Sequence, residues 1–255
     1  MVALKKKLLI VFSVVLALAL FFDAPAALAG IGGSMPITVN AAQTAQMTAG
    51  EIFRRNADAV FMIETFDSDG DSIRTGSGFF ISETGLAVTN LHVIANAESA
   101  VITLYSGSKY QMRGVHAVSE EFNLIIFSID SDEKEWNHLT LADSSLIETG
   151  NSVYTIGSPL GYINTMSGGI ISSTRREVDG ENLIQFTAPI SFGSGGSPLF
   201  NTRGEVIGIA SSSFSYGQNL NLAVPVNHVK TMQPGECVPL SELILTQEPD
   251  TTDEG

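Results

Sequence analysis

Two stretches of sequence decide how this chain folds: Thr89-Asn90-Leu91-His92-Val93-Ile94 and Gly193-Ser194-Gly195-Gly196-Ser197-Pro198. The first places a histidine just after a predicted strand, at its junction with a short helical turn. The second is a glycine-rich turn that contains serines. A serine peptidase needs a hydroxyl nucleophile, a histidine base, an acid that fixes the histidine tautomer, and backbone N–H groups that bind the oxyanion. The two stretches offer candidates for all of these groups except the acid.

The chain between Ala59 and Pro225 consists of short β-branched or alternating runs that Gly, Asn, Asp and Ser interrupt, which is typical of an all-β fold. The predicted strands are Val60 to Phe66, Gly78 to Ile81, Leu86 to Thr89, Ala100 to Leu104, Tyr110 to Val118, Leu124 to Ile129, Ser152 to Ile156, Thr165 to Ser172, Asn182 to Thr187, Pro198 to Phe200, Val206 to Ser212 and Leu220 to Val224. The polar stretch from Asp130 to Glu135 divides them into two groups. We therefore predict two six-stranded antiparallel β-barrels, over about 59–130 and about 138–225.

Short helices are expected on both sides of the barrels. Thr48 is a candidate N-cap with Glu51 three residues later, which is the pattern of a capping box. Residues 226–232 are predicted to form a last helix that Pro234 and Gly235 end.

The N-terminal segment 1–29 has the pattern of a secretory signal peptide, since Lys5 to Lys7 precede an apolar run from Leu8 to Phe22. This run is shorter than the roughly 20 residues that a membrane-spanning helix needs, so we expect cleavage and no stable membrane span. Ala29 is the first choice of cleavage site and Ala41 the second. The sequence thus predicts a secreted protein with bacterial-type export.

The remaining segments divide by composition. Residues 30–46 are expected to form a flexible mature N-terminus and 47–233 the folded domain. Residues 234–255 are polar and acidic, which predicts a disordered tail.

Charge and cysteine content narrow the function classes. The formal net charge is −14, so a polyanion is repelled and nucleic acid is not expected as a partner. Cys237 is the only cysteine, so no disulfide can form within the chain and a packed core must stabilise it. The histidines form no metal-type spacing with Asp, Glu or Cys, and neither a metal nor a cofactor is expected. The sequence leaves the oligomeric state open.

Further motifs occur in a fixed order along the chain. They are Thr75-Gly76-Ser77-Gly78-Phe79-Phe80-Ile81, Gly157-Ser158-Pro159-Leu160-Gly161, Ser167-Gly168-Gly169-Ile170-Ile171-Ser172, Gly204-Glu205-Val206-Ile207-Gly208-Ile209 and Ala223-Val224-Pro225. Together with the two opening stretches, they resemble the bacterial trypsin-like peptidases of the HtrA/Deg group, from about Glu51 to Met232. The resemblance implies a chymotrypsin-like double barrel with an active-site cleft between the barrels. The PDZ domain that many relatives carry is not expected after Met232.

The resemblance assigns the catalytic base to His92. The family's acid is an aspartate just before the last strand of the first barrel, and here Asn123 stands at that position. An asparagine can accept a hydrogen bond from the imidazole, but it can also donate one, which favours the tautomer that cannot take the serine proton. Glu120 and Glu121 are nearby surrogates for the acid.

The nucleophile turn departs further from the family pattern, Gly-Asn-Ser-Gly-Gly-Pro or Gly-Ser-Ser-Gly-Gly-Pro. An ungapped match places Gly193 on the oxyanion-hole glycine, Gly195 on the nucleophile and Ser197 on the last glycine. Gly193 and Gly195 would still supply N–H groups to an oxyanion hole. We expect Ser197 to need a backbone conformation that relatives reserve for glycine, with positive φ and some strain.

A rival alignment with two compensating shifts makes Ser194 the nucleophile of a Ser-Gly-Gly turn. We prefer the ungapped alignment, because the flanking Ala188 to Ser191 and Pro198 to Phe200 keep the family length without gaps.

The resemblance also assigns substrate binding. Ser211, Ser212 and Ser213 correspond to the edge on which relatives dock the substrate backbone, and Leu222 would lie in the opposite wall. Such an edge can bind an extended peptide through added-strand hydrogen bonds. The expected partner is therefore a polypeptide substrate or another protein.

The sequence supports two functions. The first is a secreted pseudoprotease that keeps a peptide- or partner-binding cleft and cuts slowly or not at all, because Asn123 replaces the acid and Gly195 the nucleophile. The alternative is an active serine endopeptidase that uses Ser194, or Ser197, with His92.

Overall fold

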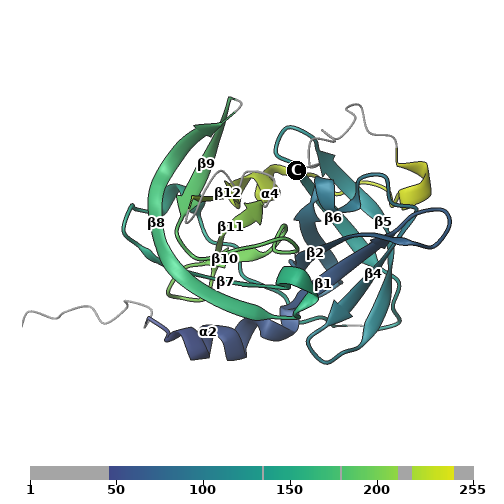
Figure 1. Ribbon diagram of the computed structural model, residues 1–255, viewed down its shortest axis with the longest axis horizontal. Helices are drawn as coiled ribbons and strands as arrows, with labels where there is room; N and C mark the ends of the chain where they lie inside the picture. Colours follow the sequence, from purple (N-terminus) through teal and green to yellow (C-terminus); the bar gives the residue numbers. More distant parts are fainter. Residues whose placement is uncertain (1–45, 134, 179, 212–219, 244–255) are drawn as a thin grey trace, which may run out of the picture. The chain divides into compact units, whose positions relative to one another are not determined.

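The computed structural model describes residues 46–133, 135–178, 180–211 and 220–243. In this part of the chain, the strands form two closed barrels of six antiparallel strands each, and the helices are short (Figure 1). The prediction of an all-β, chymotrypsin-like double barrel is confirmed.

The first barrel follows the strand order β1-β2-β3-β6-β5-β4. Its strands are β1 (Val60–Phe66), β2 (Ser72–Phe80), β3 (Leu86–Asn90), β4 (Ser99–Leu104), β5 (Lys109–Ser119) and β6 (Leu124–Ile129). β3 pairs with β6 so that Asn90 lies opposite Leu124. This pairing brings the residues that follow β3 next to those that precede β6.

The second barrel follows the order β10-β11-β12-β9-β8-β7. Its strands are β7 (Ser152–Gly157), β8 (Thr165–Val178), β9 (Glu181–Phe186), β10 (Pro198–Phe200), β11 (Val206–Ser211) and β12 (Asn221–Pro225). The loop from Phe186 to Pro198 carries the glycine-rich turn.

Two strands extend by six residues beyond their predicted bounds, β2 at its start and β8 at its end. β2 begins at Ser72 because its polar, exposed first half continues the pairing with β1, where Arg74 lies opposite Thr65. β8 reaches Val178 because Arg176 still pairs with Leu183 of β9, and Figure 1 shows this long strand curving around the second barrel. Exposed strand ends lack the apolar alternation on which the prediction depended.

The core joins the two barrels. Phe61, Phe80 and Phe127 are fully buried within the first barrel. A second cluster combines residues of both, among them Phe79 from β2 and Phe200 from β10. Burial of such side chains contributes roughly 1.5–3 kcal/mol each, so the interface between the barrels is part of the stable core.

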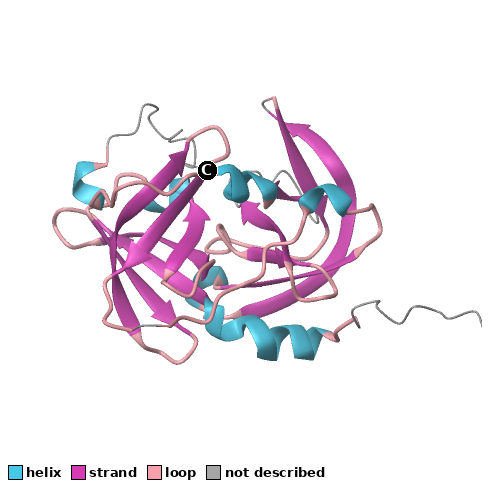
Figure 2. Ribbon diagram, turned by 180° about the vertical axis from the view of Figure 1, so that it is seen from behind, coloured by secondary structure: helices cyan, strands magenta, loops and turns pink. Residues whose placement is uncertain are grey.

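The helices are few and short (Figure 2). They are α2 (Ala49–Asn56), η1 (Ala57–Ala59), α3 (Leu91–Ile94), η2 (Ser144–Leu146), η3 (Pro159–Gly161), α4 (Asn227–Thr231) and η5 (Leu240–Glu242). The predicted capping box of α2 is present, since Glu51 N–H donates to Thr48 Oγ1 (3.3 Å) and Thr48 N–H donates to Glu51 Oε2 (2.7 Å). The predicted last helix corresponds to α4.

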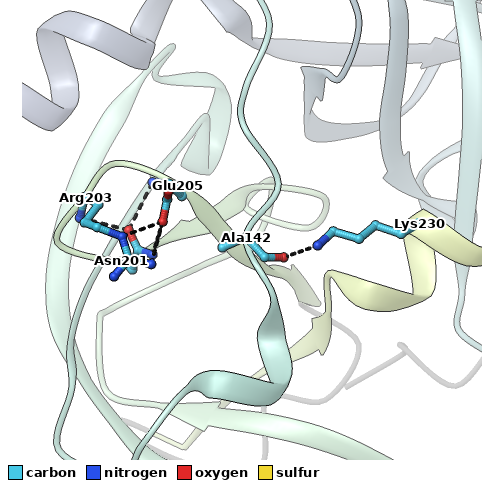
Figure 3. A network of polar contacts seen from close by, with 5 residues as sticks. All are labelled: Ala142, Asn201, Arg203, Glu205 and Lys230. Atoms are coloured by element: carbon cyan, nitrogen blue, oxygen red, sulfur yellow. Dashed lines mark hydrogen bonds and ion pairs between the residues drawn. The ribbon is translucent and has the colours of Figure 1, made fainter. Parts of the chain in front are cut away.

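Side-chain contacts hold the turn between β10 and β11 and the helix α4 in place (Figure 3). Asn201 Oδ1 accepts from the N–H of Arg203 (2.8 Å), and Arg203 Nε donates to Glu205 Oε2 (2.8 Å), which closes the turn between β10 and β11. Lys230 on α4 donates to the carbonyl of Ala142. α4 is thereby held against the segment that leads into the second barrel.

Residues 235–243, which we call the C-terminal strap, lie on the first barrel. Val238 and Val115 exchange two backbone hydrogen bonds of 2.8 Å, and Leu240 is 8% exposed in that barrel's core cluster. The tail disorder predicted from residue 234 is therefore wrong for the strap, because its backbone pairs with Val115 of β5 and the Leu240 side chain packs into the core cluster. Residues 244–255, the signal peptide 1–29 and most of 30–46 lie outside the described residues. None of the described helices is long and apolar enough to cross a membrane.

Candidate active site

His92 is the second residue of α3, two residues after β3 ends at Asn90. The hydrogen bonds that begin this short helix come from Asn123: its carbonyl accepts from the N–H of Leu91 (2.9 Å) and from Nδ2 of Asn90 (3.1 Å). The β3–β6 pairing makes this possible, since Asn123 directly precedes β6. The predicted base and the predicted acid position are thus brought together.

Asn123 adopts a left-handed backbone conformation, with φ of 51°. Asparagine tolerates this region better than most residues with a side chain. Its amide then faces His92: Oδ1 accepts from the His92 backbone N–H (2.9 Å), and Nδ2 lies 2.7 Å from His92 Nδ1. One side chain therefore contacts both the backbone and the ring of the histidine.

The His92 backbone determines which way the Asn123 amide points. A backbone N–H can only donate, so the atom that faces it must be the carbonyl oxygen Oδ1. The amide nitrogen Nδ2 then faces the ring, and because it can only donate, His92 Nδ1 must be the acceptor. The neutral imidazole consequently carries its proton on Nε2.

This tautomer is the wrong one for a general base. A serine peptidase needs an unprotonated Nε2 that accepts the hydroxyl proton, with Nδ1–H held by a carboxylate. Here Asn123 holds the opposite arrangement. In the neutral ring, Nε2 is therefore a donor and not an acceptor.

The surrogate acids lie in the same loop. Burial and, after it, the neighbouring Glu121 raise the pKa of Glu181 on β9, so Glu121 faces the second barrel. Because Asn123 already occupies the Nδ1 side of His92, a carboxylate from Glu120 or Glu121 cannot take that place without displacing the amide.

Two successive β-turns form the glycine-rich loop. Ser194 N–H donates to Ser191 O (2.9 Å), and Ser197 N–H donates to Ser194 O (3.0 Å). Gly193 (φ 87°) and Gly196 (φ 85°) occupy the third positions of these turns, whose positive φ defines type II geometry. Both positions match family glycines in the ungapped alignment.

The serine hydroxyls of this loop are used or buried elsewhere. Ser194 is 4% exposed, and its Oγ accepts from the N–H of Ser191 (3.3 Å). Ser197 is fully buried, and its Oγ lies against Gly157 with no hydrogen-bond partner among the described residues. Among the contacts of the described residues, neither hydroxyl is hydrogen-bonded to His92. The expected positive φ at Ser197 is wrong: Gly196 takes that conformation instead.

Ser77 of β2 fastens the loop to the first barrel. Its N–H donates to Gly195 O (2.8 Å), its Oγ donates to Gly193 O (2.8 Å) and accepts from Ser158 N–H (2.8 Å), and its carbonyl accepts from Thr89 Oγ1 (2.7 Å). Sequence reasoning gave Ser77 no individual role. Its only signal was its place in the Thr75–Ile81 motif.

The oxyanion-hole candidates remain available. In the described part of the chain, no acceptor takes the N–H of Gly193 or of Gly195. With both carbonyls bonded to Ser77, the two peptide groups are held in place. Such fixed donors are what an oxyanion site requires.

The predicted substrate-binding residues are only partly described. Ser211 is 1% exposed, and its hydroxyl has no partner within the part of the chain that the structure describes. Leu222, opposite Ser211 in the β11–β12 pair, is 4% exposed in the core. Contact of these residues with a peptide would use their backbone. Ser212 and Ser213 lie outside the described residues.

A ring contact connects the Asn123 loop to the second barrel. Phe122 stacks on His228 of α4, with ring centroids 3.6 Å apart. Burial lowers the pKa of His228, and Glu121 opposes this effect by favouring the charged ring. A histidine whose pKa is lowered on folding stabilises the protein while neutral, and this stability is lost as the pH falls below the ordinary value of 6.5.

His228→Gln is therefore expected to weaken the loss of stability on acidification from about pH 7 to pH 5. Urea midpoints of both proteins across this range measure the effect. A wild-type midpoint that changes with pH just as the variant's does would contradict the role of His228.

Comparison with known proteins agrees with this geometry. Residues 76–209 match the family described as trypsin-like peptidase domain. The chain belongs to this family. Among its trypsin-like relatives, serine protease HTRA1B of Danio rerio is 35% identical over 71% of this chain and 37% of its own length. Putative serine protease HhoA of Synechocystis sp. is 33% identical over 62% of this chain and 42% of its own length.

The solved structure of an HtrA-type protease with a tripeptide is 30% identical, with a TM-score of 0.65, and covers 72% of this chain and 62% of that chain. The predicted resemblance to the HtrA group of trypsin-like serine peptidases is therefore confirmed. The chain spans about two fifths of the length of the two curated relatives.

Proposed function

We propose that this member of the HtrA group is a secreted pseudoprotease, which binds extended polypeptides or a protein partner in its cleft and cuts them slowly or not at all. The observation that carries the proposal is the contact between Asn123 Nδ2 and His92 Nδ1. It leaves the imidazole without an acceptor for the proton of a nucleophile.

The second support is the nucleophile position. In the loop that Ser77 holds, position 195 is a glycine, while Gly193 and Gly195 still present N–H groups. Residues of a catalytic triad act as a unit, so the loss of two members leaves only the residual catalysis of binding and the oxyanion site. The cleft can thus bind a peptide carbonyl without attacking it.

The relatives support two further parts of the proposal: that the ligands are polypeptides and that the protein is located outside the cytoplasm. A solved HtrA-type relative holds a tripeptide, and several curated relatives are described as probable periplasmic serine endoproteases, such as the DegP-like protein of Rhizobium meliloti. The signal-peptide pattern of residues 1–29 supports the same compartment.

Fluorophosphonate labelling tests the proposal. The mature wild-type protein is treated with the probe, and modified residues are mapped by mass spectrometry. We expect no label at Ser194 or Ser197. A variant with Gly195→Ser and Asn123→Asp serves as the matched control and is expected to be labelled at position 195.

The alternative, an active endopeptidase, makes the opposite prediction. Stoichiometric label on Ser194 or Ser197 that disappears in His92→Ala would establish it and overturn the pseudoprotease. The hydrogen bond from Ser191 N–H to Ser194 Oγ and the burial of Ser197 oppose this outcome.

A further inference from the structure

A second histidine–serine pair lies on the first barrel, beneath the C-terminal strap. His116 is on β5 and Ser128 on the neighbouring strand β6. Ser128 Oγ lies 2.9 Å from His116 Nε2, and His116 Nδ1 lies 3.0 Å from the carbonyl of Gly235 in the strap. Both residues are only partly buried, so each keeps some exposed surface.

The strap fixes the tautomer of His116. A carbonyl can only accept, so the proton of the neutral ring stands on Nδ1, facing Gly235. Nε2 is then the acceptor, and the Ser128 hydroxyl donates to it. The ring is also held through its backbone, because the N–H of Gly235 donates to the His116 carbonyl (2.8 Å).

This arrangement is the reverse of the one at His92. A hydroxyl within hydrogen-bond reach of an imidazole, which a third group orients, is the structural signature of an activated nucleophile. At His116 that third group is an acceptor, as a general base requires. At His92 it is a donor.

We propose that Ser128 and His116 form a nucleophilic dyad that reacts with activated acyl compounds, of which aryl esters are the substrate class. Ser128 Oγ attacks the ester carbonyl carbon while its proton passes to His116 Nε2. The tetrahedral adduct collapses, the carbon–oxygen bond to the aryl group breaks, and the phenolate takes the proton from His116. Ser128 is left as an acyl ester that water hydrolyses by the reverse transfers.

The surroundings explain why aryl esters, rather than peptides, fit this dyad. The strap N–H groups of Gly235 and Val238 are used in hydrogen bonds to His116 and Val115. With these donors unavailable to an oxyanion, the reaction depends on a leaving group that departs readily. The amine of a peptide is a poor leaving group, whereas a nitrophenolate is a good one.

The test uses 4-nitrophenyl acetate on the full mature chain. Cys237 is exposed and its Sγ lies 4.0 Å from Ser128 Oγ, so Cys237→Ala is the background that removes acetylation of the thiol. Acetylation is followed site by site by mass spectrometry. Ser106, an exposed serine that donates to Ser108 rather than to a histidine, is the internal reference.

Ser128 is expected to be acetylated at least about 10²-fold faster than Ser106, and His116→Gln is expected to remove most of this difference. Ser128→Cys should keep a reactive nucleophile that still depends on His116. Equal rates at Ser128 and Ser106, or a fast rate at Ser128 that His116→Gln leaves unchanged in a folded protein, would overturn the dyad. Both outcomes would mean that the hydrogen bonds only hold the strap.

Discussion

The double variant Gly195→Ser, Asn123→Asp is expected to hydrolyse an unfolded polypeptide at least about 10³-fold faster than the wild-type chain. In trypsin, changing the triad aspartate to asparagine costs about 10⁴ in kcat, and removing the nucleophile of a triad costs still more. The carboxylate that Asn123→Asp introduces would accept from the His92 backbone N–H and from Nδ1–H at once, which restores the tautomer that the amide excludes.

The backbone can accept the new serine. Gly193 and Gly196 have positive φ, but Gly195 between them does not, so a side chain at position 195 meets no left-handed strain. Gly195→Ser alone should show weak activity, because His92 would still lack an acceptor. Adding His92→Ala to the double variant should abolish the gain. A folded double variant that is inert even with Ser197→Gly would show that the residue assignment is wrong.

Gly196→Ala is expected to lower the free energy of unfolding by roughly 2–5 kcal/mol and to detach the glycine-rich loop from β2. About 1–2 kcal/mol comes from the left-handed backbone, with φ of 85°. A further 1–3 kcal/mol or so comes from overpacking, because the new Cβ would collide with Ser77 O and Thr89 Oγ1. Urea unfolding of the purified variant measures the sum.

Gly150→Ala is the matched control. Gly150 has a similar φ of 92°, but no atom lies within 4 Å of the position that its Cβ would take. This variant should lose only the backbone contribution of about 1–2 kcal/mol. Equal losses for Gly150→Ala and Gly196→Ala would mean that contact with Ser77 does not hold the loop.

Features that depend on neighbouring residues could be predicted from the sequence. The capping box of Thr48 and Glu51 spans one turn of chain, and the strand alternation that gave two barrels is equally local. The loop glycines could be assigned only through the family resemblance, and the positive φ expected at Ser197 lies at Gly196 instead. The approach of Asn123 to His92 came from the family resemblance.

Features that depend on contacts between distant parts of the chain could not be predicted from the sequence. Ser77 looks like any serine in a strand, and its role exists only because Gly193 and Gly195 fold back onto it. The acidic composition of the strap predicts disorder, whereas its order comes from pairing with Val115, which is distant in the sequence. The direction of the Asn123 amide needed the position of the His92 backbone N–H, which no sequence pattern gives.

We infer that the tautomer of His92 prevents this histidine from acting as the general base of a serine peptidase. Nitrogen NMR of the ¹⁵N-histidine-labelled mature protein, with His92 assigned by comparison with His92→Gln, distinguishes a protonated Nδ1 from a protonated Nε2. At a pH where the ring is neutral, we predict an unprotonated Nδ1 and a proton on Nε2. In Asn123→Asp, the proton should move to Nδ1. A wild-type His92 that carries its proton on Nδ1 would contradict the assignment of the Asn123 amide and restore the case for an active peptidase.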